Sequence, residues 1–281
     1  QFDVIAQELG MDPLELRMKN GVETGDHTAT GQVLKGCGLK ECIQKAHDAL
    51  HLKPLDSSTP GKRRGRGISC MWKFTNGYAH VSAGLKINED GSAVLLTSSV
   101  EHGQGAHTAL RQMAGEALGI SPDKIGIAHP DTGVSPYGWE TSSSMSIYYD
   151  GNAIQDAAAD CKRQLFEVAA LKLEADPADL ETNDGQVFVK GSSERSVSFE
   201  DCAMGVPGPD GQFVGGPILG TGHFTPLEQT GLDPQTGQGK QPGAFWMFAA
   251  QGAEVEIDEG TGQVTVLNLT AAHDVGKAIN M

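Results

Sequence analysis

The feature that most constrains the fold is residues 100–152, where two turns rich in glycine or hydroxyl groups each lead into a helical pattern. The β-rich run Ala93–Thr97 precedes the first turn, Gly103-Gln104-Gly105. Apolar residues at helical spacing follow the turn, at Ala106, Leu110, Met113 and Ala117. A strand, a tight turn and a helix are therefore predicted. The glycines let the backbone approach a ligand, and the N–H groups of the first helical turn favour an anion, although a plain glycine turn would have the same sequence.

The second turn places hydroxyl groups before a longer helix. Turn-forming residues occupy Asp131–Trp139, and a hydroxyl-rich segment follows at Thr141, Ser142, Ser143, Ser144 and Ser146. The helix is predicted from apolar positions at Ile147, Ile154, Ala158, Cys161, Leu165 and Val168. The hydroxyl groups are candidate ligand donors at its N-terminus. Helix capping and loop solvation explain the cluster alone equally well.

The two motifs together are more specific than either alone. The segments Glu101–Thr108, Asp131–Pro136, Glu140–Ser144 and Gly151–Ala153 resemble the molybdopterin-binding subunit of the xanthine dehydrogenase and aldehyde oxidase family of molybdenum hydroxylases. Three flanking segments agree with that family's patterns in order and rough spacing. They are Asp12–Asn20 ("DPxELRxxN"), Glu254–Asp258 with Thr261-Gly262 ("EVEVDxxTG") and Asp274–Asn280 ("DVGxxINP").

The resemblance implies a cofactor site. The cofactor would be molybdopterin, or molybdopterin cytosine dinucleotide, with molybdenum, and its polar pterin and pyrophosphate call for amide, hydroxyl and backbone N–H donors. The first turn would contribute Gly103, Gln104, Gly105, His107 and Thr108. The second would contribute Thr141, Ser143, Ser144 and Ser146. His107 is as readily a surface histidine.

The resemblance also implies a reaction, the oxidative hydroxylation of an aldehyde or an N-heterocycle such as a purine with water as the oxygen source. Electrons would leave through iron–sulfur and FAD subunits or domains. The family's catalytic glutamate would lie beyond Met281, so no catalytic residue and no metal ligand is assigned here, and the chain is expected to be a central fragment that is inactive alone. The alternatives are a non-catalytic cofactor-carrying or scaffold subunit and a generic phosphate- or nucleotide-binding domain. The substrate, the pterin form and the electron acceptor stay open.

Composition narrows the class of protein. A formal net charge of −15 opposes binding to nucleic acid or an anionic membrane. The sequence has neither an apolar run long enough to span a membrane nor a signal-peptide pattern, which favours a cytoplasmic protein. A small-molecule substrate is expected, and a homo-oligomer is compatible with the sequence. The five cysteines lack CxxC spacing, so we expect free thiols and no iron–sulfur cluster.

The rest of the chain is predicted to be α+β, with mixed sheets and two long central helices. We divide it into a helical entry segment and linker at 1–60 and a molybdopterin-binding domain at 61–281. Helices are expected at 2–9, 14–20 and 39–52, a linker with a basic cluster at 55–66, and loops at 205–222 and 225–243. Long antiparallel strands are expected at 245–257 and 264–271. His47 and His51 have metal-ligand spacing, but a solvated surface is favoured.

Overall fold

The computed structural model describes residues 1–55, 59–75 and 79–279, so residues 56–58 of the expected linker and Asn280 of the third family motif lie outside the described residues. The chain divides into two compact units. Unit 1 comprises residues 1–76 and 228–278, and unit 2 comprises residues 77–227 and 279–281. Both units combine helices with sheets, and unit 2 contains a mixed sheet, which confirms the predicted α+β class.

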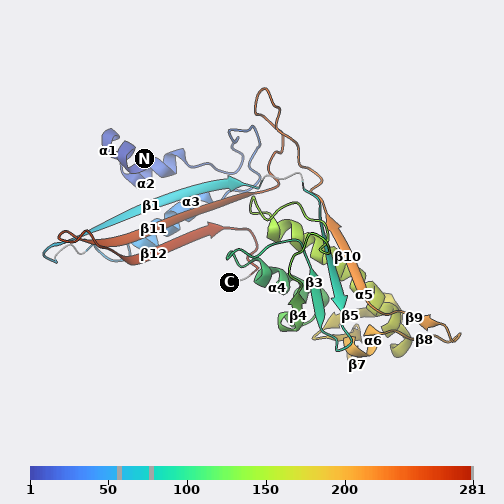
Figure 1. Cartoon of the computed structure of the whole chain (residues 1–281). Helices are drawn as coiled ribbons and strands as arrows, with labels where there is room; N and C mark the ends of the chain where they lie inside the picture. Colours follow the sequence, from blue (N-terminus) through green and yellow to red (C-terminus); the bar gives the residue numbers. More distant parts are fainter. Residues whose placement is uncertain (56–58, 76–78, 280–281) are drawn as a thin grey trace. The chain divides into compact units, whose positions relative to one another are not determined.

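Unit 1 is a three-stranded antiparallel sheet with helices, in the order β1-β11-β12 (Figure 1). The strands are β1 (Lys62–Phe74), β11 (Trp246–Asp258) and β12 (Val264–Asp274), and the helices are α1 (Phe2–Leu9), α2 (Pro13–Asn20) and α3 (Leu39–Leu50). The apolar side of α3, with Ile43 fully buried, packs with Phe248 and Ala250 of β11 in one core. Phe248 is thus a core residue, and the Trp246 ring makes tilted contacts with Trp72 and Phe74, with centroids 4.9 and 5.1 Å apart.

Capping explains where the N-terminal helices begin and end. The Asp12 carboxylate accepts hydrogen bonds from the backbone N–H groups of Leu14 and Glu15, and Pro13 occupies the first helical position of α2. Gly10 ends α1 in the left-handed conformation. The three predicted N-terminal helices are confirmed, with the last ending at Leu50.

The expected linker at 55–66 is wrong in its second half, because Lys62–Arg66 begins β1. Each basic side chain there has an acidic partner across the sheet or turn. Lys62 and Arg64 contact Glu256, and Arg66 contacts Glu254. Cross-strand pairing therefore explains the basic cluster, since opposite charges on facing positions stabilise a sheet.

Unit 2 is built on a four-stranded mixed sheet in the order β10-β2-β3-β4, with α4 and α5 packed against it (Figure 1). The strands are β2 (Val81–Ile87), β3 (Ala93–Leu96), β4 (Ile125–Ile127) and β10 (Leu219–Phe224), and the helices are α4 (Ala106–Leu118) and α5 (Ser146–Leu173). The smaller elements are η1 (Pro122–Lys124), η2 (Pro177–Asp179), β5 (Leu180–Asn183), β6 (Gln186–Val189), β7 (Ser192–Ser198), α6 (Phe199–Ala203), β8 (Val206–Pro207) and β9 (Phe213–Val214).

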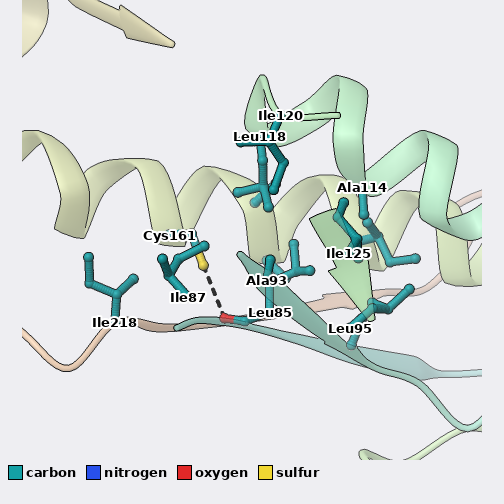
Figure 2. Close-up of a cluster of buried hydrophobic side chains, with 14 of the residues drawn as sticks. Leu85, Ile87, Ala93, Leu95, Ala114, Leu118, Ile120, Ile125, Cys161 and Ile218 are labelled. Carbon is teal, nitrogen blue, oxygen red and sulfur yellow. Dashed lines mark hydrogen bonds between the residues drawn. The ribbon is translucent and has the colours of Figure 1, made fainter. Parts of the chain in front are cut away.

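The core of unit 2 lies between the sheet and the two helices (Figure 2). Leu85, Leu95 and Leu118 are fully buried there. The Cys161 thiol, on the core side of α5, donates a hydrogen bond of 3.1 Å to the Leu85 carbonyl (Figure 2). This packing fixes the N-terminus of α5 relative to the end of β3. The first predicted turn follows β3, and the second predicted turn leads into α5.

The loop expected at 205–222 is partly wrong, because residues 219–224 form β10 and pair with β2. Its glycines permit a close approach of strand and helix. A Cβ at Gly220 would lie 2.3 Å from the Ala157 carbonyl oxygen, and one at Gly222 would lie 2.3 Å from both Ala153 O and Ala157 N. These glycines therefore indicate helix packing instead of a loop.

Candidate functional site

The first turn is closed by a carboxylate from its own chain. Glu101 Oε1 accepts hydrogen bonds from the backbone N–H groups of Gly103 and Gly105, at 2.9 and 3.0 Å, and Oε2 accepts one from His107 N–H at 3.0 Å. Donation from Gly105, then from His107, lowers the pKa of Glu101. The anion expected at the N-terminus of α4 is therefore supplied by Glu101, the first residue of the segment 101–108, to which the sequence alone assigns no role.

Gln104 folds its amide back over the same turn. Its Nε2 donates to Val100 O at 2.9 Å, and its Oε1 accepts from His102 N–H at 2.8 Å. Gly103 and Gly105, with φ of 103° and 80°, give the backbone its left-handed bends, and no atom lies within 4 Å of where their Cβ atoms would be. The open space allows the close approach that a ligand would need.

The histidine and threonine that follow have different environments. His107 is half-buried, and its Nε2 donates to the Ser99 carbonyl at 2.8 Å, so the ring ties the start of α4 to the end of the preceding strand segment. Thr108 is exposed. This geometry favours a supporting role for His107 over direct contact with a ligand.

The second turn lies against the first. The Thr141 hydroxyl oxygen accepts a hydrogen bond of 2.8 Å from Val100 N–H, while the Val100 carbonyl is held by Gln104. The structure thus brings Gln104 and Thr141 to opposite backbone groups of one residue. The sequence predicts only that each turn precedes a helix. The hydrogen bond between Val100 and Thr141 is the contact that joins the two turns.

Two serines of the second turn have unusual backbone conformations. Ser143 and Ser144 have φ of 50° and 59°, in the left-handed region that residues with a Cβ rarely occupy. Ser146 begins α5, and the buried Met145 before it anchors the turn to the core. Strain of this kind persists where surrounding structure holds it, often at ligand sites.

A buried carboxyl group connects α5 to the segment that follows β3. Asp150, on α5, is 5 % exposed and accepts a hydrogen bond of 2.8 Å from the Thr97 hydroxyl. Burial raises the pKa of Asp150 to about 6, against the lowering effect of the bond from Thr97. Thr97 Oγ1 also accepts from Ser99 N–H. The spacing of Asp150 from Ile147 and Ile154 places it on the core side of α5, and that spacing was a signal that sequence reasoning missed.

Within residues 1–55, 59–75 and 79–279, no group of three or more histidine, cysteine, aspartate or glutamate side chains is suited to holding a metal ion. His47 and His51 stack face to face with ring centroids 4.1 Å apart, and Cys37, Cys42, Cys70, Cys161 and Cys202 are free. Within the same residues, no helix is long and apolar enough to cross a membrane.

Comparison with known proteins identifies the family to which the chain belongs. Residues 42–281 match the family model described as a molybdopterin cofactor-binding domain, so the chain belongs to that family and the resemblance is confirmed. It is 30 % identical to an aldehyde oxidoreductase of Megalodesulfovibrio gigas over 99 % of this chain and 28 % of that protein. It is 29 % identical to a putative xanthine dehydrogenase molybdenum-binding subunit of Escherichia coli K12 over 72 % of this chain and 28 % of that protein.

A solved structure agrees. The chain resembles the aldehyde oxidoreductase of Desulfovibrio gigas with a TM-score of 0.70 and 29 % identity, covering 99 % of this chain and 28 % of that one. The chain thus spans less than a third of the length of these relatives.

Proposed function

We propose that this chain holds the molybdopterin cofactor of a molybdenum hydroxylase. The hydrogen bond from Val100 N–H to Thr141 carries the proposal, because it joins the two turns whose side chains match the family motifs. When bound, the cofactor would supply a molybdenum centre that exchanges two electrons with a substrate. The chain's own residues would bind and orient its polar groups.

The donor chemistry of the two turns fits that cofactor in different ways. Ser143 and Ser144 shortly precede α5 and Ser146 begins it, so their hydroxyl groups would donate to a pyrophosphate at the helix N-terminus, where the dipole also favours an anion. In the first turn Glu101 already accepts from three backbone N–H groups, so this turn would contribute mainly the Gln104 amide and the open space over Gly103 and Gly105.

The activity of the whole protein follows as part of the same proposal. We infer oxidative hydroxylation of an aldehyde or an N-heterocycle such as a purine, with water as the oxygen source, since relatives are named aldehyde oxidoreductase and xanthine dehydrogenase molybdenum-binding subunit. The second name describes one subunit of an enzyme, which supports partner subunits for this chain. We infer that partner subunits or domains carry the iron–sulfur and FAD centres that remove the electrons.

Elemental and pterin analysis of the full-length protein tests the proposal. Molybdenum and pterin should co-purify with it in near-equal amounts, and Ser144→Ala should lower both. Ser193→Ala, an exposed serine in β7, is the matched control and should leave both unchanged. A protein isolated under cofactor-replete conditions with neither molybdenum nor pterin would contradict the proposal. If the cofactor is present but aldehydes and N-heterocycles are not turned over, the cofactor-binding proposal stands and the proposed hydroxylase activity is contradicted.

A further inference from the structure

The Glu101 carboxylate engages three converging backbone donors while its side chain stays exposed. Burial therefore does not hold it in place, and its hydrogen bonds do. The donors point inward because Gly103 and Gly105 adopt positive φ, an arrangement in which successive N–H groups form a concave anion site. The glycines thus serve the carboxylate as well as any approaching ligand.

The shape of this turn also sets the direction of Gln104. The amide of Gln104 bridges Val100 O and His102 N–H, which lie on either side of Glu101. Without the carboxylate, three donors at the start of α4 would lose their protein acceptor, and the glycines would be free to adopt other backbone conformations. The bridging bonds of Gln104 depend on the conformation that would then be lost.

We propose that Glu101 is a positioning residue, an anion built into the chain that fixes the Gly103–Gly105 turn and through it the Gln104 side chain. This inference rests on the proposed function in one respect, that Gln104 faces the cofactor. Glu101 is assigned a role through the turn, because both of its oxygens accept from backbone N–H groups of that turn.

Chemical rescue tests the proposal in the full-length protein. Glu101→Ala opens an anion site that added formate should fill. Hydrogen exchange at the amides of Gly103, Gly105 and His107 should become several-fold faster in this variant and slow again with formate. The molybdenum content should fall and should recover when formate is present during cofactor loading. Glu116→Ala, at an exposed position of α4, is the matched control and should change neither measurement.

Glu101→Gln provides a second, milder variant. Its amide oxygen can still accept from Gly103 and Gly105. The other carboxylate oxygen is replaced by an NH₂ group, so the His107 N–H loses its acceptor and exchange should quicken mainly at His107. Unchanged exchange at all three amides in Glu101→Ala would overturn the positioning role. So would faster exchange that formate does not slow.

Parallel measurements on Gln104→Ala separate the two proposals. If Gln104→Ala retains full molybdenum while Glu101→Ala shows formate-reversible exchange, the turn is positioned as proposed and the cofactor role of Gln104 fails. If Gln104→Ala loses molybdenum while Glu101→Ala retains both its cofactor and slow exchange, the cofactor site stands and the positioning role fails.

Discussion

Asp150 is a carboxyl group held inside the core of unit 2, and its side chain connects α5 to the end of β3. It accepts one hydrogen bond from Thr97, and burial raises its pKa to about 6. An acid whose pKa is higher in the folded state than in the unfolded state binds more protons when folded. The free energy of unfolding therefore falls as the pH rises from about 4 to about 6. Above pH 6 the full cost of burying the ionised Asp150 carboxylate is present.

Asp150→Asn should remove this pH dependence. The amide oxygen can still accept from Thr97, and no charge is buried, so relative to the unchanged protein the variant should gain stability progressively between pH 4 and pH 6. The gain should level off at about 3 kcal/mol, the value of roughly two pKa units. Urea unfolding at pH 4, 5, 6 and 7 measures it, with the exposed Asp123→Asn as the control for a lost charge. A difference that stays constant with pH would contradict the assignment.

The strained serines make a second prediction at the residue scale. Glycine accepts the left-handed conformation of Ser144 without a Cβ clash, so Ser144→Gly should raise the free energy of unfolding by about 1 kcal/mol. The same change removes a hydroxyl from the cofactor turn, so molybdenum retention should fall. Thermal unfolding and metal analysis of one preparation check both effects. Higher stability with undiminished molybdenum would show that the Ser144 hydroxyl has no part in binding.

At the scale of elements, β10 shows what a pattern of residue types fails to predict. The glycines and prolines between 205 and 222 predicted a loop. The prediction failed at β10 because composition carries no information about packing against a helix that is distant in sequence. The same glycines allow β10 to contact α5. The β3 strand, the α5 helix and the β11 and β12 pair were predicted well, because their apolar spacing reflects local periodicity.

Gly222→Ala should therefore destabilise unit 2. The new methyl group would meet Ala153 O and Ala157 N, backbone atoms of α5 that cannot rotate away, so we expect a loss of about 2 kcal/mol. Gly126→Ala in β4, where the nearest atom is 3.9 Å from the added Cβ, is the matched control. Equal melting temperatures for the two variants would mean that β10 and α5 are not in close contact.

The candidate site was only partly predictable for a related reason. The motif residues were found because a strand, a turn and a helix follow one another in sequence. The roles of Glu101 and Thr141 depend on hydrogen bonds to turn backbone, and the one between Thr141 and Val100 spans 41 residues. Side-chain identity alone does not show whether a carboxylate faces solvent or accepts from the N–H groups of its own turn.

At the scale of the whole molecule, each unit has its own hydrophobic core. Ile43 is fully buried in unit 1 and Leu165 in unit 2, so substituting either by alanine should cost about 3 kcal/mol in its own unit. Trp139 reports on unit 2, and Trp72 and Trp246 report on unit 1.

In a Trp139→Phe background, Ile43→Ala should lower the fluorescence unfolding midpoint. In a Trp72→Phe, Trp246→Phe background, Leu165→Ala should lower it, and Ile43→Ala should lower it less. Equal shifts from both core substitutions in both backgrounds would show that the two cores unfold as one.

Hydrogen exchange of the full-length protein, with and without its molybdenum cofactor, tests directly whether the two turns form one cofactor site. Cofactor should slow exchange in residues 100–108 and 140–146 together, and Glu101→Ala should weaken the protection at both. Protection confined to one of these segments, or found only elsewhere in the protein, would contradict a single cofactor site.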